Sequence, residues 1–458
     1  MTANTEVTSK LMEATSLFYL ITVLTITLLL ILSSRRHSHL KLPPTIPGFL
    51  PIIGHLHLIA RWPSQPLHRT LAVLSSTYGP ILHLRFGSRL VLVVSSPSAA
   101  EECLTTNDRI FANRPLLLSG KYLGFNHSIL GIAPYGPHSR NLRRIATVEL
   151  LSTSRVASLA LIRADETQSP LRRHRRQQLE SRRDEDKIKE RGMMRLGKET
   201  DERFQRMVYE RRKRRRVVGK EEEEEKTLAD VMLALQEEEP ERYSDAIIKG
   251  MLWALIAAGT DTTSVTMEWA LSLLLNHPNT LKKVRDEIDF HVGHDRLITD
   301  SDLPHLPYLQ NIIKETLRLY PAGPLLLPHH SSANCTVEGR QIASGTMLII
   351  NVYAIQRDPK LWKEAESFRP ERFDEEEVAE GFKFFPFGSG RRRCPGEGMA
   401  NRVLGLTLGA LVQCFEWERV GEEMIDLSEG EGLTLPKLVP LEVKYKPREA
   451  MVNVLSQL

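Results

Sequence analysis

The chain has 458 residues, of which 41% are hydrophobic, enough for about three average domains or one large one. Its net charge of +4 is small for this length and does not favour a nucleic-acid partner. The four cysteines, Cys103, Cys335, Cys394 and Cys414, show no metal-type or redox spacing and do not suggest a disulfide framework. We therefore expect the main body to lie in a reducing compartment.

The first clear pattern is residues 14–34, which contain an uncharged run from Leu17 to Leu32. As a helix these residues would span roughly 31 Å, close to the hydrocarbon thickness of a bilayer. Arg35 and Arg36 follow, so the positive-inside rule predicts a single-pass transmembrane anchor with a cytoplasmic body. A cleaved signal peptide is the main alternative, but the residues before the run are not basic and no small-residue cleavage site follows.

Residues 42–51 carry four prolines in ten positions, which favours a stiff, extended hinge before the main body at 52–458. Early in that body, Ile81–Phe86 and Arg89–Ser95 are apolar, β-branched runs joined by Gly-Ser. This pattern predicts a β-hairpin.

Most of the remaining body has helical patterns. The longest predicted helix runs from Ser244 to Asn276 and is followed by His-Pro, which ends it. It would cross about 50 Å, the width of a domain. Further helices are predicted at Asn279–Asp289 and Tyr308–Leu319. The sequence thus predicts a mainly α fold with a smaller β-rich N-terminal part.

Residues 163–226 break this pattern, because they are highly charged and poor in apolar residues. Basic runs at 172–176 and 211–216 precede an acidic run at 221–225. Such a segment buries little apolar surface. A solvated helix face or loop is favoured over a nucleic-acid patch, because the acidic run would offset a phosphate-binding field.

Within the long predicted helix, residues 258–263 read Ala-Gly-Thr-Asp-Thr-Thr. Glycine and hydroxyl side chains lower helix propensity, so a local break with freed backbone groups is expected there. Taken alone, the hexapeptide is equally consistent with a polar kink that has no function.

The most specific motif is residues 385–396, Phe-Pro-Phe-Gly-Ser-Gly-Arg-Arg-Arg-Cys-Pro-Gly. Its glycines allow a tight turn, and arginines beside Cys394 favour the thiolate that binds metal. The positions of Phe387, Gly390, Arg392 and Gly396 relative to Cys394 resemble the haem-ligand loop of the cytochrome P-450 family. The alternative, a surface turn around a structural cysteine, does not explain four matched positions.

This resemblance implies haem b with Cys394 as the axial ligand of its iron. A thiolate in that place pushes electron density towards oxygen and favours cleavage of the O–O bond. Residues 135–144 are similar to the family helix that reaches the haem propionates, and Arg143, Arg392 and His329 are the predicted propionate partners. Ser139 stands where the family pattern has a tryptophan, which removes one donor.

The family pattern also assigns a structural network and catalytic residues. Glu315 and Arg318, at i and i+3, would join Arg372 in a buried network that braces the haem loop. Asp261 and Thr262 would deliver protons to the distal oxygen. The predicted pocket lining near the iron is Ala258, Leu325, Leu326 and Leu327.

Segments around 328–335, 354–362 and 394–402 resemble the plant subgroup that includes isoflavone 2'- and 3'-hydroxylases. What this implies is a monooxygenase of the endoplasmic reticulum membrane that takes a small aromatic substrate and receives electrons from an NADPH-dependent reductase. The rival interpretations are a haem-thiolate isomerase and a non-catalytic, decayed relative. The second is motivated by 163–226, where a substrate-roof region of the family is shortened.

Overall fold

The structure, a computed structural model, describes residues 15, 17–25, 45–60, 65–158, 190–218, 227–374 and 381–458. Of the predicted anchor, residues 17–25 are helical and exposed, and most of the rest lies outside the described residues. Among the residues that the structure describes, no helix is both long and apolar enough to cross a bilayer. The predicted hinge is described from Thr45 onwards, where Thr45 and Leu50 form isolated β-bridges.

The β-rich part is built on the predicted hairpin. Strands β1 (Ile81–Phe86) and β2 (Arg89–Val94) pair antiparallel, β6 (Met347–Ile350) lies parallel to β2, and β3 (His329–His330) follows β6. Successive side chains of β2 enter different apolar clusters, because a strand alternates its faces. The sheet is therefore buried on both sides.

Two small sheets and several short helices complete the frame. The sheets are β4 (Cys335–Val337) with β5 (Arg340–Ile342), and β7 (Phe415–Arg419) with β8 (Val443–Pro447). The short helices are α2 (Leu56–Ala60), α3 (Leu67–Tyr78), α4 (Pro97–Leu104), α5 (Asp108–Phe111), α6 (Leu118–Tyr122), α7 (Pro137–Ile145), α8 (Thr153–Ser158), α15 (Val352–Ile355) and α17 (Val452–Gln457), with a π-helical turn at Ala146–Leu150.

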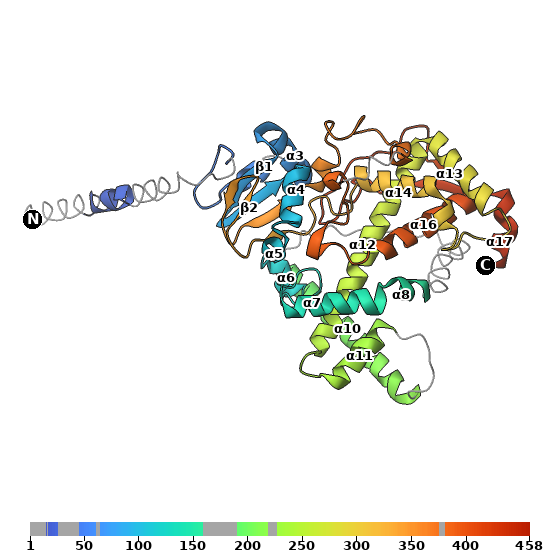
Figure 1. Ribbon diagram of the computed structural model, residues 1–458, viewed down its shortest axis with the longest axis horizontal. Coiled ribbons are helices and arrows are strands. Elements are labelled where there is room, and N and C mark those ends of the chain that lie inside the picture. Colours follow the sequence, from blue (N-terminus) through green and yellow to red (C-terminus); the bar gives the residue numbers. More distant parts are fainter. Residues whose placement is uncertain are drawn as a thin grey trace, which may run out of the picture.

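Helix α12 (Asp245–Asn276) runs through the middle of the helical part (Figure 1). Helices α13 (Pro278–His291), α14 (Pro307–Leu319) and α16 (Glu397–Cys414) pack against its C-terminal half in the largest apolar cluster. At the centre of this cluster the Trp269 ring stacks on Tyr320, with ring centroids 3.7 Å apart. The predicted helices are thus confirmed, with ends that shift by one or two residues.

Helices α10 (Glu190–Val218) and α11 (Leu228–Glu238) pack at the other end of α12 (Figure 1). The charged segment buries more than its composition suggests, because Phe204 and Val208 stand four residues apart on one face of α10 and enter an apolar cluster. Arg211 and Arg212 pair with Asp230 and Asp245. The rest of 163–226 lies outside the described residues.

Candidate active site

The glycine-arginine loop is a tight turn immediately before α16. The Cys394 backbone N–H donates to the Phe387 carbonyl oxygen at 2.9 Å. Gly388 and Gly390 have φ angles of 69° and 67°, a region that other residues avoid. A Cβ atom on Gly390 would lie 2.5 Å from the Leu104 carbonyl oxygen. Glycine at 390 is therefore required both for the backbone angle and for the contact with α4.

The Cys394 thiol is solvent-accessible although protein packs around it. The pKa of this thiol is raised, chiefly by burial and also by Glu397, whereas the Gly396 backbone N–H, Arg143 and Arg393 lower it. Coordination to a metal ion would favour deprotonation of the thiol, since a bound cation is the largest local charge in such a site. The loop thus combines a thiol ligand with positive neighbours.

A short exposed stretch lies halfway along α12. Residues 258–261 are exposed, whereas Ile248–Leu252 before them and Val265 and Trp269 after them are buried within the same helix. A Cβ atom on Gly259 would meet no other atom within 4 Å. The middle of the central helix therefore borders free space.

Two of the predicted pocket leucines, Leu325 and Leu326, pack against apolar clusters of the sheet, and Leu326 also faces the cysteine loop. Leu326 has a φ angle of 52°, and its Cδ1 would lie 3.6 Å from a Cβ on Gly388 of the cysteine loop. Leu327 approaches Gly131 in the same way, also at 3.6 Å. Leu325 packs against the apolar cluster of the sheet. A non-glycine residue with positive φ is uncommon and often marks a functional site.

A cluster of buried and half-buried arginines lies beside the loop, and among the described residues Arg143 and Arg392 have no carboxylate partner. Arg392 donates to the carbonyl oxygens of Ala112 and Ala133 at 2.6 and 2.7 Å. Burial, and then Arg143, lower the pKa of Arg392 to about 10. Burial also lowers the pKa of Arg143. Within the described part of the chain, neither arginine forms an ion pair with an acidic side chain.

Arg114 belongs to the same cluster and was missed from the sequence. It is 6% exposed and donates to the carbonyl oxygens of Gly131, Leu327 and Pro328. Burial, and then Arg392, lower its pKa to about 9. Nothing in the local sequence distinguishes it from a surface arginine. Its role depends on contacts with residues more than 200 positions away.

His329 lies in this cluster as a neutral ring. Its Nδ1 donates to the Phe111 carbonyl oxygen at 2.9 Å, so Nε2 carries no proton. Burial, and then Arg114, lower its pKa to about 3. His329 therefore offers no N–H to a carboxylate in this state, and the arginines are the better candidates for that contact.

Ser139, in the place of the family tryptophan, serves its own helix. Its hydroxyl donates to the Gly136 carbonyl oxygen at 3.1 Å and accepts from the Gly136 N–H at 3.0 Å. Ser139 is 4% exposed. It therefore stabilises the start of α7 and leaves no donor for an external group.

The donor set of this site fits haem. A thiol ligand, an exposed stretch on the central helix and a buried arginine cluster that has no acidic partner among the described residues are consistent with an iron atom, a ring beside the helix and two carboxylates. A buried cation without an anion is costly, so the cluster itself favours an anionic ligand.

The polar hexapeptide does not break α12. The helix is continuous from Asp245 to Asn276, so the predicted break is wrong. The Thr262 hydroxyl donates to the Ala258 carbonyl oxygen at 2.7 Å, one turn earlier, which satisfies the hydroxyl without opening the backbone. Asp261 is exposed, and its Oδ2 accepts from the Thr434 hydroxyl at 2.8 Å.

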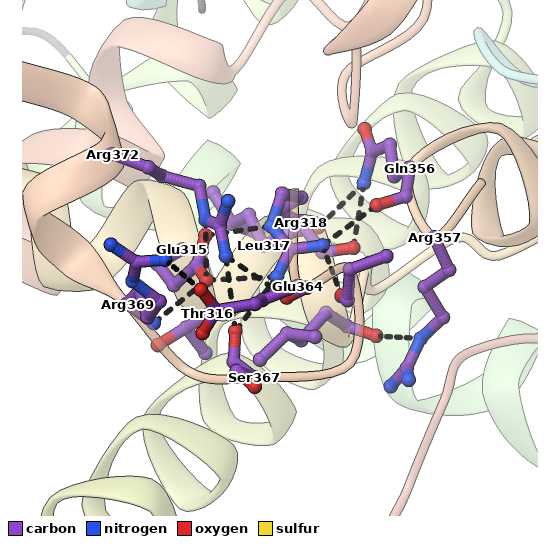
Figure 2. Close-up of polar contacts among 12 residues, drawn as sticks. Glu315, Thr316, Leu317, Arg318, Gln356, Arg357, Glu364, Ser367, Arg369 and Arg372 are labelled. Carbon is purple, nitrogen blue, oxygen red and sulfur yellow. Dashed lines mark hydrogen bonds and ion pairs between the residues drawn. The ribbon is translucent and has the colours of Figure 1, made fainter. Parts of the chain in front are cut away.

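Glu315 lies between Arg318 and Arg372 in a buried network (Figure 2). Arg318 binds both carboxylate oxygens of Glu315, at 2.7 and 2.8 Å, and Arg372 binds Oε1 at 3.0 Å. Arg318 also donates to the carbonyl oxygens of Gln356 and Ala365. The network therefore links α14 by hydrogen bonds to residues 356–372, which precede the cysteine segment.

The fold and this site define a haem-thiolate protein, and comparison with known families agrees. The family model described as cytochrome P450 matches residues 43–191 and 185–443. The chain belongs to this family, whose members are oxidoreductases that carry haem on a cysteine thiolate and receive electrons from NADPH through a reductase.

Relatives from plants are the most informative matches. A cytochrome P-450 of Catharanthus roseus is 44% identical over 515 residues, covering 97% of this chain and 100% of the relative. Isoflavone 3'-hydroxylase of Medicago truncatula is 42% identical over 495 residues, covering 94% and 97%. A zebra fish cytochrome P-450 solved with progesterone superimposes with a TM-score of 0.71 at 26% identity, covering 84% of this chain and 100% of that structure. The resemblance to plant isoflavone hydroxylases is thereby confirmed.

Proposed function

We propose that this chain is a monooxygenase that hydroxylates a small aromatic secondary metabolite of the isoflavone or flavonoid type, with Cys394 as the ligand of the haem iron. The observation that carries the proposal is the accessible Cys394 thiol, held by a glycine turn beside Arg143 and Arg392, neither of which has an acidic partner among the described residues. The reaction would convert R–H, O₂, two electrons and two protons into R–OH and H₂O.

Arg114, Arg143 and Arg392 would pair with the two haem propionates. The negative charges of two carboxylates would offset the positive charges of these buried guanidinium groups. Charge-assisted hydrogen bonds are also stronger than neutral ones. When bound, haem supplies the oxygen chemistry, and its thiolate ligand favours O–O cleavage.

The remaining tasks belong to the protein side chains. Asp261 would take protons from water. The Thr262 hydroxyl, hydrogen-bonded to the Ala258 carbonyl oxygen, would pass these protons to the distal oxygen. Leu326, Leu327 and Ala258 would cover the substrate ring with apolar surface.

The reductase would dock on the face that carries the cysteine loop. Arg140, Arg144, Arg391 and Arg393 are exposed on α7 and on that loop. Such a basic surface suits an acidic partner, because complementary charge speeds association. The uncharged segment 14–34 would anchor the chain in the endoplasmic reticulum membrane with the body on the cytoplasmic side.

A second candidate, a haem protein without efficient turnover, is favoured by two observations. A cavity of about 550 Å³ lies between α10, α11 and α12, and Ile256 in its lining is 47% exposed. The alignment with the Medicago relative spans 495 positions, more than the 458 residues of this chain, so that relative has positions that this chain lacks. An incomplete roof over the substrate would admit water. An isomerase is disfavoured, because the acid–threonine pair at 261–262 is present.

The test is the absorption spectrum of the reduced, CO-treated protein. Cys394→Ala should lose the long-wavelength Soret band of thiolate-ligated haem, and Cys335→Ala, a matched half-buried control, should keep it. An unchanged band in Cys394→Ala would remove this residue from the ligand position and with it the proposal.

A further inference from the structure

A segment near the C-terminus is hydrogen-bonded along one face of α12. Asn276 exchanges hydrogen bonds with the backbone of Ile425 at 2.8 and 2.9 Å. Glu268 accepts from the Leu441 N–H at 2.9 Å. Trp269 and Asp261 bind residues 435 and 434 of the same segment. Residues seven apart stand two turns apart on one helix face, so these contacts form a strip that ends at Asp261.

The turn that carries Thr434 is fixed from its other side. The backbone of Gly430 donates to the Pro436 carbonyl oxygen, and that of Leu438 to Ser428, both at 2.8 Å. Glu429 in this turn is buried and accepts from His68 and Arg69 at 2.7 Å. Burial alone would raise its pKa, but those two partners hold it at about 2. The backbone at Thr434 is therefore positioned by contacts independent of Asp261.

The Asp261 carboxylate has one anchored oxygen. Its Oδ2 accepts from the Thr434 hydroxyl at 2.8 Å, whereas among the described residues nothing donates to Oδ1. Asp261 is exposed, so without this bond its side chain would sample several rotamers. A hydrogen bond to a carboxylate from a fixed hydroxyl selects one of them.

We propose that Thr434 is a positioning residue for proton delivery: it holds the Asp261 carboxylate by Oδ2 and leaves Oδ1 free to exchange protons with water. This inference rests on the proposed role of Asp261 as the proton-delivering acid. Groups that act in proton transfer need a fixed orientation, and residues behind them commonly supply it.

The experiment compares Thr434→Val, which keeps the shape and removes the hydroxyl, with Thr434→Ser, which keeps the hydroxyl. Thr336→Val, an exposed threonine on β4, is the matched control. With reductase and NADPH, oxygen is reduced by two electrons and two protons to H₂O₂, or by four of each to two H₂O. Slower proton delivery raises the peroxide share, and this readout does not require a bound substrate.

Thr434→Val should raise the peroxide yield per NADPH about threefold, whereas Thr434→Ser and Thr336→Val should match the parent chain. Amide hydrogen exchange of residues 430–438 should stay within about threefold of the parent in Thr434→Val, because the turn has its own anchors. The CO spectrum should be unchanged in all variants.

Asp261→Asn separates this inference from the proposed function. If Asp261→Asn leaves the peroxide yield unchanged, the proposed role of Asp261 is wrong. If Asp261→Asn raises it but Thr434→Val does not, the acid acts without positioning and the inference about Thr434 is overturned. If Thr434→Val and Thr434→Ser raise the peroxide yield equally, the inference about Thr434 is overturned as well. The same holds if amide hydrogen exchange accelerates throughout 430–438 as the peroxide yield rises. Either result would indicate that Thr434 has only a structural role.

Discussion

Arg114 should contribute to haem affinity far more than to the stability of the haem-free protein. It is 6% exposed, donates to three carbonyl oxygens and has no carboxylate partner among the described residues. Burial, followed by Arg392, lowers its pKa from 12.5 to about 9. At neutral pH the Arg114 guanidinium remains charged, so burial of this charge lowers the stability of the folded protein by its full free-energy cost.

The free-energy cost of burying the Arg114 charge and the stabilisation from its hydrogen bonds are of similar size. The fall from 12.5 to about 9 corresponds to about 5 kcal/mol. Three hydrogen bonds from the charged guanidinium to carbonyl oxygens return about 1.5–2 kcal/mol each, the lower part of the range for charged groups. Arg114→Met should therefore change the unfolding free energy of the haem-free chain by only about 1 kcal/mol. Losing a charge-assisted bond to a propionate should weaken haem binding by about 1.5–3 kcal/mol, or roughly 10- to 150-fold.

The assay measures haem transfer from each variant to an excess of apomyoglobin, and urea unfolding of the haem-free chain. Arg318→Met is the control, because it removes an equally buried arginine and leaves Glu315 without its bidentate partner. It should destabilise the haem-free protein by about 3–5 kcal/mol. If Arg114→Met destabilises the haem-free chain as much as Arg318→Met and leaves haem transfer unchanged, the propionate role is refuted.

Other consequences are open to measurement. Thr262→Ala should retain the CO spectrum and form more peroxide per NADPH, and coupling equal to that of the parent would exclude Thr262 from proton delivery. Glu315→Gln should lower stability by about 3 kcal/mol in urea unfolding, because Arg318 and Arg372 would lose their shared carboxylate; a change below about 1 kcal/mol would contradict a bracing role. Replacing 163–226 with the matching segment of the Medicago hydroxylase should tighten the binding of a flavonoid, read as a haem spin-state shift, by about tenfold. Tight binding by the unaltered chain would show that its roof is complete.

The local sequence pattern was sufficient to predict the main helices, the hairpin and the cysteine loop. Two apolar, β-branched runs joined by Gly-Ser predict a hairpin over 81–95, and the apolar run ending at His277-Pro278 predicts α12, because both depend on neighbours a few residues apart. The turn around Gly390 is likewise local, since positive φ selects glycine whatever packs on it. The network of Glu315 with Arg318 is one helical turn and was accessible in the same way.

Tertiary structure alone decided the contacts across the chain. The family resemblance, and not spacing, suggested Arg143 and Arg392, and no pattern singled out Arg114, whose carbonyl partners lie on other segments. The expected break in α12 is absent because helix propensity is a weak preference, and the buried residues on either side of the hexapeptide hold the helix in place by packing. The bond between Asp261 and Thr434 joins residues 173 positions apart. Sequence periodicity determines which face of an element is apolar, whereas the partner of a polar side chain is set by how the elements pack.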